Sequence, residues 1–243
     1  MKSQRMLKYY ISTILILLMI FSVEAQNNPD SDQDKSQDST KFKQKYGLRL
    51  GVDVGKIVRT FIDDDYTGFE INADYRYSKN VYIAGELGTE EKTTTTEFLN
   101  STAKGSYFKV GIDYNMYKNW LDMENMIYAG FRVGASTFSQ TVNSYTIFNT
   151  NHEFPEATIT ESIDFNGLTA IWAELILGIK AEVFNNLYVG LNLQLKGRIT
   201  ETEPDNFENI YIPGFGRTYD SGSFGVGFGY SISYLIPLYK KEK

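Results

Sequence analysis

The residues that could support nucleophilic catalysis are a single histidine and two serines, one on each side of it in the sequence. His152 lies beside Asn151 and Glu153 in a segment expected to be a long loop, flanked by Ser144 and Ser162. A histidine activates a hydroxyl, for example for acyl transfer, only when it is positioned on that hydroxyl. Because nothing in the spacing fixes this geometry, the sequence favours a solvated loop histidine and predicts no catalytic residue.

Two further motifs have the composition of ligand sites but not their spacing. The run Asp63–Asp65 could bind Ca²⁺ or Mg²⁺ through carboxylate oxygens, but no glycine or glutamate completes a known loop pattern. Gly225, Gly227 and Gly229 alternate as in a strand and lack the following helix of a phosphate-binding loop. We therefore expect a solubilising turn and a glycine-rich strand, with no metal and no cofactor.

The composition excludes several classes of function. The 243-residue chain has no cysteine and one histidine, which rules out disulfide frameworks, thiolate metal sites and multi-histidine metal sites. Its formal net charge of −6 lacks the basic footprint of a nucleic-acid-binding protein, so we expect no nucleic-acid partner. An aromatic fraction of 15% favours a strand-rich fold.

The first 45 residues are predicted to be an export signal and a tether. Lys2, Arg5 and Lys8 precede a short apolar run, and Val23 and Ala25 offer small residues at a cleavage site. This pattern is typical of a secretory signal peptide over residues 1–25, because the apolar run is too short to span a membrane. Residues 26–45 are almost without apolar side chains and are expected to form a disordered periplasmic tether.

Residues 46–243 repeat an alternation of apolar and polar side chains. In the segment 69–77 every odd residue is apolar or aromatic and every even residue is polar. A period of two places the two sets on opposite faces of a strand. The expected strands are residues 46–61, 68–77, 81–96, 105–116, 126–142, 167–183, 187–199 and 222–238. The sequence predicts an all-β fold, an eight-stranded antiparallel up-and-down transmembrane β-barrel.

The lengths of the connections predict how the barrel is oriented. Shorter connections at residues 78–80, 117–125 and 184–186 contrast with long ones at residues 143–166 and 200–221. Outer-membrane barrels have short turns in the periplasm and longer loops outside. An even number of strands then places both ends of the barrel on the periplasmic side, where the tether belongs.

The composition of the polar face distinguishes a membrane barrel from a soluble barrel. A soluble barrel buries its apolar face, whereas an outer-membrane barrel turns that face toward lipid and encloses the polar face. Here the apolar face carries almost no charge, and the polar face combines glycines with balanced charges that suit a crowded lumen. The predicted lumen charge network is Arg49, Asp53, Glu70, Asp74, Arg76, Glu86, Lys109, Asp113, Arg132, Glu174, Lys180, Glu182, Lys196 and Arg198.

Two of the long loops are unusually apolar. Aromatic side chains with polar surroundings suit recognition of a partner, although they could equally pack on each other. The possible loop binding surface consists of Tyr145, Phe148, Phe154, Phe207, Tyr211 and Phe215.

Residues 46–240 resemble a known family. The stretches 61–66, 124–130, 180–186 and 204–215 look like an uncharacterised family of Gram-negative outer-membrane β-barrels, a domain of unknown function. Its architecture is similar to that of the small eight-stranded outer-membrane barrels. Such barrels often end on an aromatic residue that the assembly machinery recognises, whereas here Tyr239 is followed by four charged residues. The resemblance implies the fold and the location but no activity.

The sequence therefore predicts a non-enzymatic outer-membrane barrel with a structural or surface-binding role. The expected partners are outer-membrane lipid, the barrel-assembly machinery, and an unknown surface or periplasmic protein. The closed charged lumen argues against transport, because an ion-selective filter needs rings of one sign. A narrow pore, a membrane-embedded lipid-modifying enzyme and a soluble periplasmic barrel remain as alternatives.

Overall fold

The computed structural model describes residues 43–118, 124–147, 157–219 and 222–242. The predicted signal peptide, nearly all of the predicted tether, His152, Phe148 and Phe154 lie outside these ranges. Residues 43–45, which were assigned to the tether, are instead paired at the start of the first strand.

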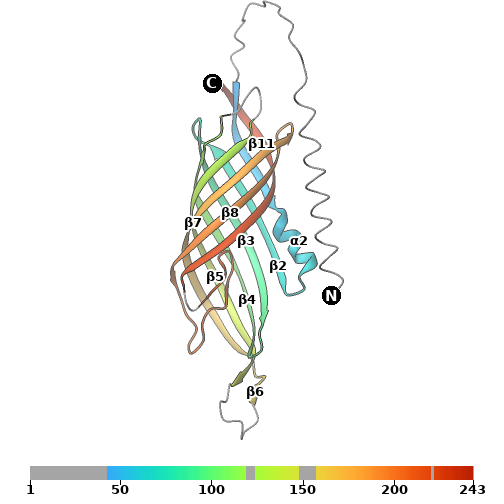
Figure 1. The fold of residues 1–243 in the computed structure, drawn as a ribbon, viewed down its shortest axis with the longest axis vertical. Helices are drawn as coiled ribbons and strands as arrows, with labels where there is room; N and C mark the ends of the chain where they lie inside the picture. Colours follow the sequence, from blue (N-terminus) through green and yellow to red (C-terminus); the bar gives the residue numbers. More distant parts are fainter. Residues whose placement is uncertain (1–42, 119–123, 148–156, 220–221, 243) are drawn as a thin grey trace, which may run out of the picture. The chain divides into compact units, whose positions relative to one another are not determined.

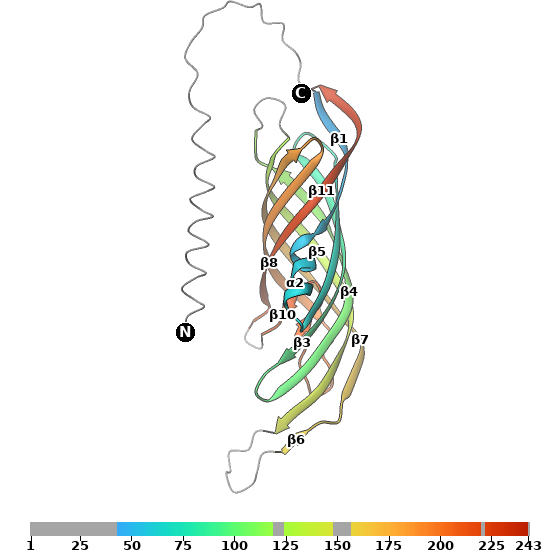
Figure 2. The ribbon, with the colours of Figure 1, turned by 90° about the vertical axis from the view of Figure 1, so that its right-hand side faces the viewer.

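Long antiparallel strands make up most of the described residues. Each strand pairs with its neighbours along the chain, and pairing of the first strand with the last closes the ring (Figures 1 and 2). In the described part of the chain the ring has eight strands, as predicted. They are β1 (Lys43–Asp53), β2 (Tyr66–Arg76), β3 (Val81–Thr95), β4 (Leu99–Asn115), β5 (Met126–Ile147), β7 (Ile163–Phe184), β8 (Leu187–Glu201) and β11 (Phe224–Glu242).

The described residues also form short strands that are not part of the ring. β6 (Ala157–Ile159) pairs with the end of β5 and extends it beyond the barrel. β9 (Tyr211–Ile212) and β10 (Gly216–Arg217) form a separate hairpin within the connection between β8 and β11. The connection between β3 and β4 is only residues 96–98, because β4 begins at Leu99, six residues before the expected start at residue 105.

The prediction was wrong in the second half of the first expected strand, residues 46–61. β1 ends at Asp53, and a helix follows, α2 (Val54–Ile62). Asp53 caps this helix, because its side chain accepts a hydrogen bond from the Lys56 backbone N–H at 3.1 Å. The apolar residues repeat every three to four positions, as in an amphipathic helix. They are Val54, Ile57, Val58, Phe61 and Ile62.

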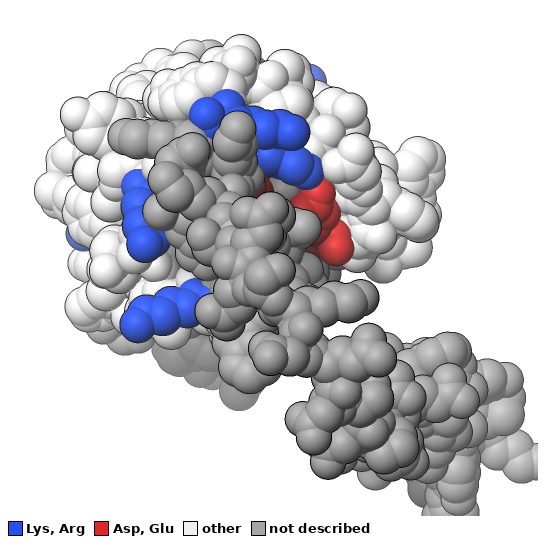
Figure 3. Space-filling model, turned by 90° about the horizontal axis from the view of Figure 1, so that it is seen from above, with Lys and Arg blue, Asp and Glu red and all other residues white. Residues whose placement is uncertain are grey.

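The outer wall of the barrel is apolar and its interior is charged. Each ring strand exposes large apolar side chains, and one example per strand is Leu50, Phe69, Leu87, Val110, Phe131, Leu175, Leu193 and Phe228. Residues on the alternate positions are buried, and many of them are ionisable. Seen from the end where the described chain ends meet, several lysine and arginine side chains and an acidic group lie on this end, and most of the remaining visible surface is uncharged (Figure 3). The alternation therefore places its apolar set outward.

Candidate functional site

The middle of the lumen is occupied by ion pairs centred on a lysine from β4. Lys109 is almost fully buried, and its Nζ lies 2.7 Å from Glu86 Oε2, 3.4 Å from Glu70 Oε2 and 3.9 Å from Glu174 Oε1. These carboxylates come from β3, β2 and β7 respectively, so one ammonium group links four strands. A buried charge is tolerated when partners of opposite sign replace its water shell.

Further pairs extend this centre in both directions. Arg132 Nη2 lies 2.7 Å from Asp113 Oδ1, and Arg132 Nε lies 3.6 Å from Glu86 Oε1. Lys196 Nζ lies 3.8 Å from Glu174 Oε1. On the helix α2, Lys56 forms ion pairs with Glu70 and Glu90. We call this set the central ion cluster; its members are Lys56, Glu70, Glu86, Glu90, Lys109, Asp113, Arg132, Glu174 and Lys196.

A second group lies nearer the end of the barrel that carries the chain ends. Arg49 Nη2 lies 2.7 Å from Asp74 Oδ1, and Lys180 Nζ lies 2.6 Å from Asp74 Oδ2. The Arg49 guanidinium carbon lies 5.4 Å from the Tyr82 ring centroid and 4.7 Å from that of Tyr188. Paired charges and aromatic rings together fill this end of the lumen.

The opposite end of the lumen is filled by the connection between β8 and β11. Ile212 and Phe215 are buried against Tyr107, Phe138 and Trp172, and the Phe215 and Trp172 rings meet edge to face at 6.1 Å. The Trp172 indole can lie across the adjacent strand β5 because its ladder partner, residue 134, is a glycine: a Cβ there would come 2.4 Å from the indole ring. Residues 211–215 therefore close this end from inside.

Charged groups from two walls hold residues 211–215 in place. Glu90 Oε2 accepts hydrogen bonds from the Tyr211 hydroxyl at 2.8 Å and from the Gly214 N–H at 2.9 Å. Lys196 Nζ donates to the carbonyl oxygens of Gly214 at 2.7 Å and Phe215 at 3.2 Å. Gly214 has φ of +83°, a left-handed conformation that glycine adopts without strain.

The fourteen predicted lumen residues do not all belong to the central ion cluster. Asp53 is buried but caps α2, and Arg49, Asp74 and Lys180 form the second group. The remaining three pair near the ends of the strands: Arg76 lies 4.0 Å from Glu124, Glu182 lies 3.2 Å from Lys45, and Arg198 lies 2.7 Å from Glu201.

Two members of the central ion cluster, Glu90 and Lys56, were not predicted from the sequence, for different reasons. Glu90 has the same parity as Glu86 on β3, so the alternation of the strand contained the signal. Lys56 falls on the wrong parity for a strand and reaches the lumen only because α2 is helical.

The predicted loop surface is only partly a surface. Tyr211 is 7% exposed and Phe215 is 3% exposed, both inside the barrel, which corrects the expectation that they lie outside. Phe207 is half-buried, with its ring centroid 5.6 Å from that of Tyr145 and 5.8 Å from that of Phe165. Among the described aromatic residues, the two apolar loops therefore pack on each other.

The acidic turn after α2 is engaged by basic side chains. Lys92 Nζ lies 3.2 Å from Asp63 Oδ2, and Arg59 Nε lies 3.1 Å from the same oxygen. Slight desolvation opposes ionisation, but these hydrogen bonds prevail and hold the pKa of Asp63 below its ordinary value. The described residues contain no cluster of three or more potential metal ligands of the histidine, cysteine, aspartate and glutamate types.

This arrangement defines the class of the protein: an eight-stranded transmembrane β-barrel, with an apolar wall and a filled, charged lumen. The described residues include no helix long and apolar enough to cross a membrane. The chain belongs to a family described as a domain of unknown function (DUF6048), which it matches over residues 6–241. The predicted resemblance to an uncharacterised family is thus confirmed.

Other comparisons add little to this assignment. No curated protein matches the chain. Among solved structures, Ail, the attachment invasion locus protein of Yersinia pestis, is 8% identical with a TM-score of 0.39, covering 79% of this chain and 95% of its own. CarO2 of Acinetobacter baumannii is 9% identical with a TM-score of 0.34, covering 80% and 99%. Both TM-scores are below 0.5, so neither protein informs the function of this chain.

Proposed function

We propose that the protein is a non-enzymatic barrel of the outer membrane, exported with cleavage after Ala25, with a structural or surface-binding role. The supporting observation is the lumen, which the central ion cluster and residues 211–215 fill inside an apolar wall. An apolar wall is stable against lipid. Paired charges from several strands cross the middle of the lumen, brace the wall and leave there a space of only about 30 Å³.

The outer connections are the proposed interaction surface. The cluster of Tyr145, Phe165 and Phe207 is only partly buried, and β6 extends β5 beyond the ring. Aromatic groups in polar surroundings suit recognition of a surface or periplasmic protein. Outer-membrane lipid and the barrel-assembly machinery are the other proposed partners.

The proposed function predicts that the barrel does not conduct ions. Eight strands leave an interior just wide enough for side chains to fill, and here those side chains are held by ion pairs. Purified protein in planar bilayers is expected to show no stable open channel. A porin reconstituted in the same way is the positive control and should conduct. A reproducible unitary conductance that changes in Glu174→Gln would contradict the closed lumen and support a pore.

The orientation of the barrel gives a second prediction. Lys79 lies in the short turn between β2 and β3, whereas Thr158 lies on β6, at the opposite end in Figure 1. Both are exposed, and the chain has no cysteine of its own. On whole cells, an impermeant thiol reagent should label Thr158→Cys and not Lys79→Cys, since short turns face the periplasm. After cell lysis both should react; labelling of Lys79→Cys alone on intact cells would reverse the orientation.

A further inference from the structure

The wall of the barrel is incomplete on the side where β1 stops. On β11, only Ser231–Glu242 pair with β1, and on β2, only Ile71–Tyr75 do so. The ladder partners of Phe224–Tyr230 all lie on β8, and those of Tyr66–Glu70 all lie on β3. Along Phe224–Tyr230 and Tyr66–Glu70 the wall therefore has two strand edges facing each other without a strand between them.

The helix α2 covers this opening unevenly. On the β2 side, the Thr60 hydroxyl accepts a hydrogen bond from the Gly68 N–H at 2.9 Å and lies 3.2 Å from the Gly68 carbonyl oxygen. On the β11 side, the start of the helix borders Tyr230, and no hydrogen bond within the described residues joins α2 to Phe224–Tyr230. Within the described residues, the helix is thus hydrogen-bonded to one edge of the opening and only packs against the other.

The two faces of α2 match the two environments that it separates. Phe61 is 82% exposed and Ile62 is 78% exposed on the outer surface, beside Val58, which is half exposed. Lys56 points the other way and pairs with Glu90 in the central ion cluster. An amphipathic helix in this position gives lipid an apolar surface and gives the lumen a charged one.

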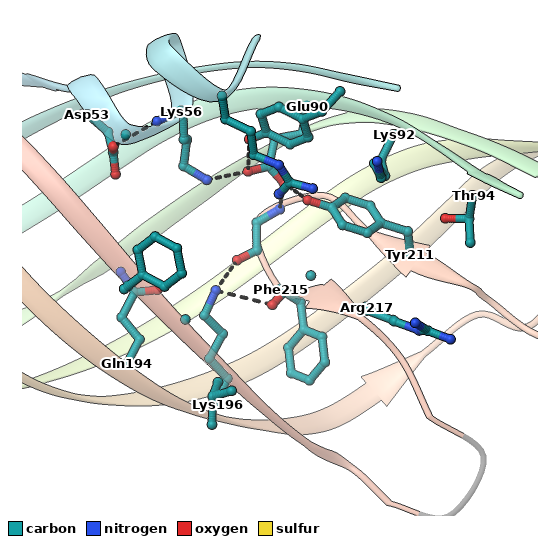
Figure 4. A pocket seen from close by; sticks show the side chains of 18 residues that line it. Asp53, Lys56, Glu90, Lys92, Thr94, Gln194, Lys196, Tyr211, Phe215 and Arg217 are labelled. Carbon is teal, nitrogen blue, oxygen red and sulfur yellow. Dashed lines mark hydrogen bonds and ion pairs between the residues drawn. The ribbon is translucent and has the colours of Figure 1, made fainter. Parts of the chain in front are cut away.

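A cavity of about 410 Å³ lies between α2, β3, β8, β11 and the β9–β10 hairpin (Figure 4). Its walls include Gly227, which faces the lumen residues Gln194 and Lys196 from the inner side of β11, and also Val226 and Phe228, which point outward from the same strand. A space that contacts both faces of β11 must pass around the free edge of this strand. The cavity therefore connects the charged interior with the lipid-facing surface through the opening beside α2.

The lining of the cavity is predominantly basic. Five basic residues line it, and only two acidic ones, Asp53 and Glu90. The basic residues are Lys56, Arg59, Lys92, Lys196 and Arg217. Arg59 and Lys92 share a single carboxylate, that of Asp63, and no described carboxylate lies within 4.0 Å of Arg217. Lys56 and Lys196 are already paired with carboxylates of the central ion cluster, so Arg59, Lys92 and Arg217 supply the basic excess of the site.

We propose that this cavity binds the anionic, phosphate-bearing headgroup of a membrane lipid, whose acyl chains lie along Val226, Phe228 and Phe61. Lysine and arginine side chains bind phosphate oxygens with strong, charge-assisted hydrogen bonds. A free phosphate ion would use the same charges but would gain nothing from the apolar rim, which favours a lipid as the source of the phosphate. This site lies in the wall, away from the outer loops of the proposed function.

Native mass spectrometry of the whole barrel in an uncharged maltoside detergent tests the proposal. We expect the wild-type protein to retain phosphatidylglycerol at least about tenfold more strongly than phosphatidylcholine, a factor that corresponds to about 1.4 kcal/mol. Inorganic phosphate should not displace the bound lipid at equal concentration. Equal retention of both lipids would overturn the proposal, and so would displacement by inorganic phosphate, which would identify a site for the free ion.

Variants locate the binding in the cavity. The double variant Arg59→Gln with Lys92→Gln should lose the preference for phosphatidylglycerol, and Arg217→Gln should weaken it independently. Lys104→Gln is the matched control, because Lys104 is an exposed lysine outside the cavity whose side chain is 69% exposed. The heat-dependent electrophoretic shift of folded barrels verifies that each variant is folded. Unchanged lipid retention in both cavity variants, or an equal loss in Lys104→Gln, would refute this site.

Discussion

Replacing Lys109 by methionine is expected to destabilise the barrel by about 3–5 kcal/mol, the typical cost of removing one partner from a buried ion pair. The ammonium group lies within 4.0 Å of Glu70, Glu86 and Glu174. Methionine fills a similar volume, so the loss comes from three carboxylates that lose their common cation. Reversible unfolding by urea in lipid vesicles measures the difference in the free energy of unfolding.

The matched control is Lys104→Met, on the same strand. Lys104 also forms an ion pair, with its Nζ 2.9 Å from Glu91 Oε2, but both side chains are exposed to solvent. Exposed pairs contribute about 0–1 kcal/mol, so this substitution should have little effect. If both variants lost the same stability, the lumen would be well hydrated, and the argument for a closed, cross-linked interior would fail.

The ring of strands could be predicted because one local signal repeats in every strand. The alternation of apolar and polar residues fixes which side chains share a face, and the outer face was assigned correctly for residues such as Leu191 and Phe228. Which charges pair is a different question. Arg132 faces Glu174 in the ladder between β5 and β7, yet its ion pairs are with Asp113 and Glu86. The length and direction of the side chains decide which charges pair, and the alternation gives no information on either.

The helix α2 was missed although its signals are present in the sequence. Asp53 is a good N-cap, and the apolar positions from Val54 to Ile62 follow a helical spacing. Val52 and Val54 continue the alternation of β1, however, so the two patterns overlap at the point where the strand ends. A helix of nine residues is marginal by itself, and its contacts with β2 and β11 stabilise it.

The inward fold of residues 211–215 could not be predicted from their composition. Aromatic residues in a loop suit a binding surface and a lumen plug equally well. The choice depends on contacts such as that between Gly214 and Glu90, which are 124 residues apart in the chain. Such contacts form because closure of the ring brings distant strands together, so no local pattern in the sequence indicates them.

Leu193→Arg tests which face of the wall meets lipid. Leu193 points outward from the middle of β8, and its ladder partners Leu177 and Phe228 are exposed and apolar too. An arginine at the bilayer midplane costs about 2–4 kcal/mol in a transmembrane barrel, so we expect a loss of this size in vesicles. Leu193→Ala is the control for the lost contacts, and it should cost less because it places no charge in lipid.

The neighbouring substitution Asn192→Arg introduces the same side chain on the lumen-facing side of β8. Asn192 points inward and borders a small cavity that is also lined by Asp53 and Asp74. The free space there is only about 30 Å³, but Asp53 and Asp74 can pair with the arginine, so its cost should be smaller than that of Leu193→Arg. In a soluble barrel this order would be inverted, because the arginine at position 193 would be solvated by water. A larger loss of stability for Asn192→Arg than for Leu193→Arg would therefore show that the apolar wall does not contact lipid, which would contradict the assignment as a membrane barrel.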